Sequence, residues 1–137
     1  MIAVLFEAWP AEGQGERYFE LAAALRPALD GVDGFVSIER FESLTEPGKL
    51  LSLSFWRSEA AVAAWRNLPS HRATQGEGRQ RVFADYRLRV AAVLRDYGMG
   101  DRAEAPTDSA AFSVAARSLA VRAAPINVAD PGPVQSP

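Results

Sequence analysis

Very few side chains in this sequence can do acid–base chemistry near neutral pH. His71 is the only histidine, and imidazole is the group that ordinarily changes its charge between about pH 5 and 8. His71 is therefore the candidate general base or hydrogen-bond donor, and the alternative is a surface histidine at the start of a helix. Arg79 is the candidate for holding an anionic oxygen, although an ion pair with Glu77 or Asp85 would explain it equally well.

Aromatic side chains flank these two residues in the sequence and could form the walls of a substrate pocket. Trp65 belongs to a helical apolar stripe, and Phe83 and Tyr86 follow at the start of the last predicted strand. Packing in the core is the simpler interpretation of all three, and the two roles are compatible. Trp9 stands at the end of the first predicted strand, where it would rim a pocket entrance or lie in a subunit interface. The expected substrate pocket therefore consists of Trp65, Phe83, Tyr86 and Trp9.

Composition excludes several kinds of site. The chain has no cysteine and a single histidine, so it can form neither a disulfide nor a thiolate metal site, and it has no HExxH zinc motif. No flavin or nicotinamide motif is recognisable either. We therefore expect no metal site and no bound cofactor.

Charge and hydropathy place the chain among globular proteins. It has 137 residues, 48% hydrophobic and 23% charged, and its 15 basic and 17 acidic side chains are too evenly balanced for a nucleic-acid surface. The N-terminus lacks a basic segment and reaches Glu7 early, which argues against a secretory signal. The alanine-rich stretch 110–124 contains Arg117 and Arg122, which argues against a membrane span. We expect a cytoplasmic protein whose partners include neither nucleic acid nor membrane.

Periodicity predicts the elements that position these residues. Ser58 and Ser70 are the predicted N-caps of two helical segments, and Pro27 is an interior breaker of an earlier one. The turn signal Glu46-Pro47-Gly48 joins two strands into a hairpin. The predicted elements are a strand over 2–9, a helix over 15–30, strands over 35–42 and 50–56, a helix from Ser58 to Leu68, a helical piece over 71–81 and a strand over 82–97.

This order, β-α-β-β-α-β, is that of the ferredoxin-like fold of the α+β class. Both helices then cover one face of a four-stranded antiparallel sheet. The first and last strands carry apolar side chains on both faces, so the helix-free face would expose a large apolar patch, which monomers rarely tolerate. Two such sheets stacked face to face bury both patches. We therefore expect a homodimeric α+β barrel.

The amino-acid composition changes after Tyr97. A linker rich in Gly, Pro and acidic residues begins there, and prolines accumulate from Pro125 onward. We expect one domain over 1–97, followed by a linker and C-terminal tail over 98–137 that lie mostly outside the core. Within the tail, an amphipathic helix is predicted from the spacing of Phe112, Ala116, Leu119 and Ala123.

The domain resembles the antibiotic biosynthesis monooxygenase family, whose members are dimeric ferredoxin-like α+β barrels. The resemblance extends over 1–97 and includes the opening IAVLFEAW and the hairpin segment GFVSIERFES; the linker DYGMGDRAEAP is also similar. Its most specific residues are Phe55-Trp56, Trp65, His71, Gln75, Gly78-Arg79, Phe83 and Tyr86.

The resemblance can be compared position by position. In the polyketide monooxygenases, an Asn one turn before the helix Trp and a Tyr six residues after it surround the substrate; these positions are Ala61 and His71 here. In the heme-degrading members, an Asn on the first strand, the helix Trp and a His ten residues later hold the heme. Those positions are Ala8, Trp65 and Gln75. Only Trp65 is retained in both comparisons, and the expected iron ligand is absent.

The resemblance implies a cofactor-independent monooxygenase that uses dioxygen to form a quinone from a small aromatic or phenolic molecule. In such chemistry the deprotonated substrate reduces dioxygen itself, so the protein supplies an apolar pocket, a base and oxyanion stabilisation. His71 would be the base, Arg79 the charge stabiliser, and Trp65 and Tyr86 pocket walls. Two alternatives are a heme-binding or heme-degrading protein and a non-catalytic dimeric ligand-binding protein.

Overall fold

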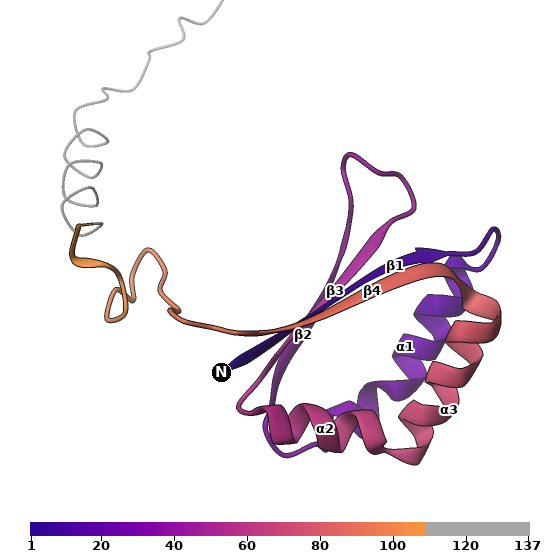
Figure 1. The fold of residues 1–137 in the computed structure, drawn as a ribbon, viewed down its shortest axis with the longest axis horizontal. Helices are drawn as coiled ribbons and strands as arrows, with labels where there is room; N and C mark the ends of the chain where they lie inside the picture. Colours follow the sequence, from indigo (N-terminus) through magenta and orange to yellow (C-terminus); the bar gives the residue numbers. More distant parts are fainter. Residues whose placement is uncertain (109–137) are drawn as a thin grey trace, which may run out of the picture. The chain divides into compact units, whose positions relative to one another are not determined.

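The computed structural model describes residues 1–108. Its four strands form one antiparallel sheet in the order β2-β3-β1-β4, with the helices on one face (Figure 1). This arrangement confirms the predicted α+β, ferredoxin-like fold. The elements are β1 (Ile2–Pro10), α1 (Gly15–Asp30), β2 (Phe35–Glu42), β3 (Leu50–Trp56), α2 (Glu59–Asn67), α3 (Pro69–Glu77), a π-helical turn (Gly78–Val82) and β4 (Phe83–Ala92).

The chain divides into two units, Met1–Leu94 and a second one that begins at Arg95. In the described part of the second unit, the Arg102 guanidinium lies 5.1 Å from the centre of the Tyr97 ring. The predicted domain boundary after residue 97 stays a prediction, and the predicted amphipathic helix of the tail lies outside the described residues. No helix within residues 1–108 is long and apolar enough to cross a membrane.

The last strand is shorter than predicted. It ends at Ala92 instead of Tyr97, because its neighbour β1 begins at Ile2 and the final sheet-like bond runs from Val93 N–H to Met1 O at 3.0 Å. Beyond that point β4 has no strand to pair with. The alternation of apolar residues in β4 does not show where its partner strand, β1, begins and therefore where the pairing stops.

The helical boundaries follow the predictions with two corrections. The Ser58 hydroxyl caps α2 as expected by accepting a bond from Ala61 N–H, at 3.2 Å. Ser70 does not cap α3: the N-cap is Leu68, and Pro69 begins the helix. Proline is suited to a first helical position, where no N–H partner is needed. Likewise, α1 continues through Pro27 to Asp30.

The core lies between the helices and the alternate residues of β1 and β3 that face them. One cluster consists of Leu29, Trp56 and Ala61, and the other of Tyr18, Leu50 and Val82. Trp56 is 1% exposed, and its indole N–H donates to Ser54 Oγ at 2.9 Å, so the buried polar group is satisfied. The opposite side of the sheet carries Leu5, Leu51, Leu53 and Phe55, which no helix covers.

Gly34 is the glycine whose replacement should disturb the core most. It has a φ of +88°, and a Cβ built there would lie 2.6 Å from the Cβ of Ala61. Gly13 has a similar φ of +73°, but nothing lies within 4 Å of its built Cβ. We expect both Gly→Ala variants to lose about 1 kcal/mol from left-handed strain, and Gly34→Ala to lose roughly 1–3 kcal/mol more from overpacking. Urea unfolding of the two variants measures the difference, and equal losses would contradict this account.

Candidate functional site

His71 and Trp65 form a stacked pair at the junction of two helices. Between α2 and α3, Leu68 adopts an extended conformation, with φ −60° and ψ 134°, which turns the chain back on itself. The turn brings the imidazole over the indole, with ring centres 4.1 Å apart and an interplanar angle of 20°. Trp65 in turn contacts the buried Trp56, at 6.5 Å between ring centres. The helix break therefore positions His71 against the edge of the core.

The hydrogen bond of His71 determines which of its nitrogens carries the proton. Nδ1 lies 3.1 Å from the backbone oxygen of Trp65, which can only accept, so Nδ1–H is the donor and Nε2 keeps its lone pair. Burial lowers the pKa of His71, while the bond to Trp65 raises it by less. The amide nitrogen of Gln75 lies 3.5 Å from Nδ1, but both groups are donors in this tautomer, so no hydrogen bond joins them. His71 is thus a half-buried neutral base with Nε2 available.

A strip of apolar side chains on β4 faces the helix side of the sheet without being covered. Tyr86, Leu88 and Val90 pair with Ala8, Phe6 and Val4 of β1, which places all six on the helix-facing side. The three β4 side chains nevertheless remain 41%, 53% and 46% exposed. We call these three residues the β4 strip. Exposed apolar residues grouped in this way commonly mark a binding surface.

The β4 strip borders both parts of the core. At one end, the Tyr86 ring lies 5.6 Å from that of Phe6 and 6.2 Å from that of Phe83. At the other end, Val90 pairs with Val4, which packs in the cluster that Trp65 also joins. Phe83 and Tyr86 therefore contact each other, and their role as pocket walls stays a prediction. Trp65 and His71 form the second group, and Trp65 and Val4 pack against the same buried cluster.

Arg79 has neither of the ion pairs considered from the sequence. It is exposed in the π-helical turn, and within residues 1–108 no acidic side chain pairs with it. Glu77 instead pairs with Arg17 at 2.8 Å, and the carboxylate of Asp85 accepts from Tyr86 N–H at 2.8 Å. Arg79 does not contact His71, so its assignment as a charge stabiliser stays a prediction.

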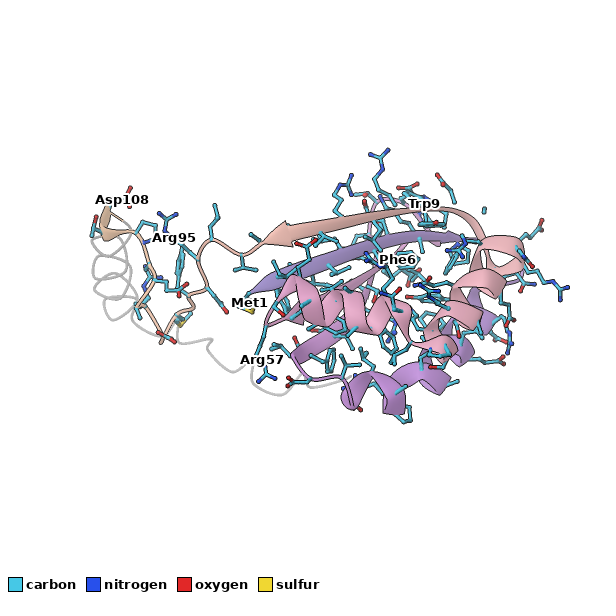
Figure 2. All side chains as sticks on the ribbon, turned by 60° about the horizontal axis from the view of Figure 1, so that its bottom comes forward. Met1, Phe6, Trp9, Arg57, Arg95 and Asp108 are labelled. Atoms are coloured by element: carbon cyan, nitrogen blue, oxygen red, sulfur yellow. The ribbon has the colours of Figure 1, made fainter. Side chains whose placement is uncertain are left out.

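Trp9 lies apart from the other predicted pocket residues. It alternates with Ala8 and points to the helix-free side, whereas Phe6 points toward the helices (Figure 2). Its indole N–H donates to Glu46 Oε1 at 2.6 Å, and the Lys49 ammonium lies 4.6 Å from its ring centre. Trp9 therefore belongs to a charged group on the opposite face.

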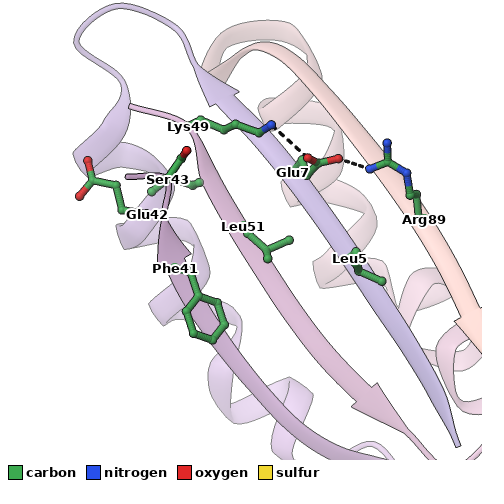
Figure 3. A pocket seen from close by; sticks show the side chains of 9 residues that line it. Leu5, Glu7, Phe41, Glu42, Ser43, Lys49, Leu51 and Arg89 are labelled. Atoms are coloured by element: carbon green, nitrogen blue, oxygen red, sulfur yellow. Dashed lines mark hydrogen bonds and ion pairs between the residues drawn. The ribbon is translucent and has the colours of Figure 1, made fainter. Parts of the chain in front are cut away.

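This helix-free face holds a shallow pocket of about 310 Å³ (Figure 3). Apolar side chains of Leu5, Phe41 and Leu51 form its floor, and Glu7 bridges Lys49, at 3.1 Å, and Arg89. Hydrogen bonds from Lys49 and Arg89 lower the pKa of Glu7, and the bond from Lys49 has the larger effect. The sequence did not point to this group, since its members meet only through the order of the strands.

The positions that hold heme in related enzymes do not fit heme here. The first-strand position is Ala8, which is 1% exposed within the core, and the iron-ligand position carries the amide of Gln75. An amide does not replace an imidazole as the axial ligand. Position 61, polar in the polyketide enzymes, is the buried Ala61 packed under Gly34. The chain therefore lacks both known sets of ligand-contacting residues, apart from Trp65.

Two proteins of known sequence are similar to this chain. Jasmonate monooxygenase ABM of Pyricularia oryzae is 45% identical over 93 residues, which are 68% of this chain and 43% of that protein. This chain thus spans less than half the length of that relative. The uncharacterised protein YqjZ of Bacillus subtilis is 29% identical over 93 residues, covering 68% of this chain and 79% of that protein.

Solved structures share the same architecture at low sequence identity. A Deinococcus radiodurans protein assigned to the antibiotic biosynthesis monooxygenases superposes with a TM-score of 0.64 at 15% identity, covering 72% of this chain and 97% of that one. Rv0793 of Mycobacterium tuberculosis gives a TM-score of 0.63 at 21% identity, covering 71% and 98%. The model of the antibiotic biosynthesis monooxygenase family matches residues 1–77. With this match across both the β1–α1 and β2–β3 segments, the chain belongs to the antibiotic biosynthesis monooxygenase family.

Proposed function

We propose that this chain is a monooxygenase that oxidises a small aromatic or phenolic molecule with dioxygen and without a bound cofactor. The observation that carries the proposal is a neutral, half-buried His71 stacked on Trp65, in a chain that also leaves the β4 strip uncovered on the helix-facing side of the sheet. Nδ1 is occupied by the Trp65 carbonyl, so Nε2 is the nitrogen able to accept a proton. The β4 strip supplies the surface on which a planar apolar substrate would lie.

The reaction balances without an external reductant. His71 Nε2 removes a proton from the acidic position of the substrate, and the resulting anion gives electrons to dioxygen. When the O–O bond breaks, an activated CH₂ becomes a carbonyl and the second oxygen leaves as water. Tyr86 and Phe83 would contact the ring system, and Arg79 would stabilise the developing negative charge if the substrate reaches the π-helical turn.

The name of the Pyricularia oryzae relative makes jasmonate a second candidate substrate. Hydroxylating an unactivated C–H bond with dioxygen requires two electrons from elsewhere, whereas a phenolic substrate supplies its own. The two candidates are therefore separated by whether oxygen uptake needs an added reductant. No contact of this site favours heme binding or a purely non-catalytic role in ligand binding. Oxygen uptake with any substrate would exclude the non-catalytic role.

We also propose that the chain acts as a homodimer through the helix-free face, in the cytoplasm. The sheet carries half-buried Leu5, Leu51, Leu53 and Phe55 on that face, with exposed Phe41 beside them. Covering this area removes apolar surface from water at about 25 cal/mol per Å². Sedimentation equilibrium is expected to give twice the monomer mass at micromolar concentration; a monomer at all concentrations would overturn this assembly.

The protonation state of His71 can be measured directly, since its imidazole gives the only histidine signals. Because burial lowers its pKa, we expect titration below the ordinary 6.5 and, at neutral pH, the neutral form with the proton on Nδ1. Long-range ¹H–¹⁵N correlation distinguishes the two tautomers. The unfolded chain binds the proton more readily, so stability should fall as pH drops from about 6.5 through the folded pKa. A pKa at or above 6.5 would contradict the site described above.

Removing the base while keeping the stack tests the catalytic role. We expect His71→Phe to lower kcat/KM for oxygen uptake with a dihydroxyanthrone-type phenol by about 100-fold or more, with the melting temperature little changed because the aromatic contact to Trp65 remains. The matched control is Arg72→Ala, an exposed neighbour on α3. In the native enzyme, kcat/KM should rise with pH and level off above the lowered His71 pKa. Unchanged turnover in His71→Phe would remove His71 from the mechanism.

A further inference from the structure

Helix α3 carries His71 but has little packing of its own. None of its nine residues is buried, and the side chain of its N-cap residue, Leu68, caps no backbone group. Gly76 lies within the helix, where glycine costs about 1 kcal/mol relative to alanine. The helix is also interrupted at both ends, by the extended Leu68 and by the π-helical turn that begins at Gly78. A segment with so few buried contacts depends on its side-chain contacts for its position.

An ion pair links α3 to the neighbouring helix α1, which lies beside it (Figure 1). Two guanidinium nitrogens of Arg17 in α1, Nε at 2.9 Å and Nη2 at 2.8 Å, approach the same oxygen of Glu77, Oε1. The third nitrogen, Nη1, donates to Glu20 within α1 at 3.1 Å and helps to orient the guanidinium. Within residues 1–108, no other ion pair joins these two helices.

Both partners of this ion pair are next to well-packed residues. In α1, Tyr18 is 7% exposed, and its ring lies 5.6 Å from that of Phe83. After α3, Gly78 is buried against the same ring, since a Cβ built there would lie 2.8 Å from Phe83 Cε2. Glu77 therefore ties the last residue of α3 to the core. His71 lies about 9 Å away along the helix axis, in the first turn.

We propose that Arg17 and Glu77 are positioning residues, which hold α3 so that His71 stays stacked on Trp65. The proposal rests on the catalytic role proposed for His71 above. The stack is a contact at the first turn of α3, and the ion pair is a contact at its last residue. Together they set the orientation of the imidazole. An exposed ion pair contributes little to global stability, so its loss should displace α3 while the rest of the domain stays folded.

The pKa of His71 reports its position. Burial lowers this pKa, the Trp65 carbonyl raises it by less, and no charged side chain of residues 1–108 is among the causes. If α3 is displaced in Glu77→Gln, the imidazole becomes hydrated and its pKa rises toward the ordinary 6.5. Removing a nearby carboxylate has the opposite direct effect, because it disfavours the imidazolium and lowers the pKa. The direction of the change therefore separates positioning from direct electrostatics.

NMR titration of His71 in Glu77→Gln tests the positioning role without an activity assay. We expect the pKa to rise and the preference for the Nδ1–H tautomer to weaken, with the melting temperature little changed. Glu20→Gln is the matched control, because it removes the same charge from Arg17 but leaves the bond to Glu77; its titration should match that of the native chain. A pKa that stays the same or falls in Glu77→Gln, or that rises equally in Glu20→Gln, overturns the positioning role.

Cross-linking restores the link between the helices without its charges. The native chain has no cysteine, so the double variant Arg17→Cys, Glu77→Cys can be bridged by a short bismaleimide. Before bridging, His71 should titrate as in Glu77→Gln. After bridging, it should regain the low pKa of the native chain. A bridged variant that keeps the raised pKa overturns the role of the link.

Kinetics separate the positioning role from the proposed function. We expect Glu77→Gln to lower kcat for the phenol about tenfold and to leave KM little changed, since the base is displaced while the apolar surface is kept. If His71→Phe leaves turnover unchanged, the proposed function fails, and the titration still decides whether Glu77 positions His71. If His71→Phe is inactive while Glu77→Gln keeps full activity, the positioning role is overturned and the proposed function stands.

Discussion

The structure depends on the alternation of β1 and β3, the two central strands, which present large apolar side chains to both faces of one sheet. Ile2, Val4 and Phe6 face the helices, while Leu5 and its neighbours on β3 face away. Because α1, α2 and α3 lie on the same side of the sheet, its two faces are covered differently (Figure 1). One becomes the core and borders the candidate site. The other is left to be covered from outside the chain or exposed to water.

On the helix side, the helices cover the sheet only in part, and the candidate site lies where the coverage ends. The helices bury Trp56 and Ala61 over the middle of the sheet, but the facing side chains of the edge strand β4 stay open. The break at Leu68 turns the chain, so that the first turn of α3 carries His71 over Trp65. Trp65 thereby has two contacts that fit the interpretations considered from the sequence: it packs against the buried Trp56 and stacks on the His71 imidazole. A packing role does not exclude a catalytic environment, since the same contact desolvates the imidazole and lowers its pKa.

Local patterns in the sequence predict the elements well, because the side chains that set each period are close in the chain. They predict the range of α1 and the cap at Ser58 for this reason, although Pro27 does not interrupt the helix as its residue type suggested. They could not predict where β4 ends, which depends on the length of β1, nor that Pro69 begins a helix. The residues of the candidate site also differ in whether the sequence predicts their contacts. His71, Trp65, Phe83 and Tyr86 are near one another in sequence and form two contacting pairs, whereas the position of Trp9 depends on strand parity and on Glu46 of a distant turn.

The apolar surroundings of the helix-free face explain how its charged side chains are paired. A carboxylate at Glu7, in the middle of a central strand, would be costly if the face were covered and the charge left unpaired. Arg89 approaches it from β4 and Lys49 from the turn just before β3 (Figure 3), and Lys49 also contacts Trp9 and Glu46. This arrangement compensates the central charge within the chain, so it does not require a partner. Glu39, by contrast, is exposed on the edge strand β2, where its charge stays hydrated without a partner in the same sheet. Position in the sheet thus decides whether a carboxylate on this face needs compensation within the chain.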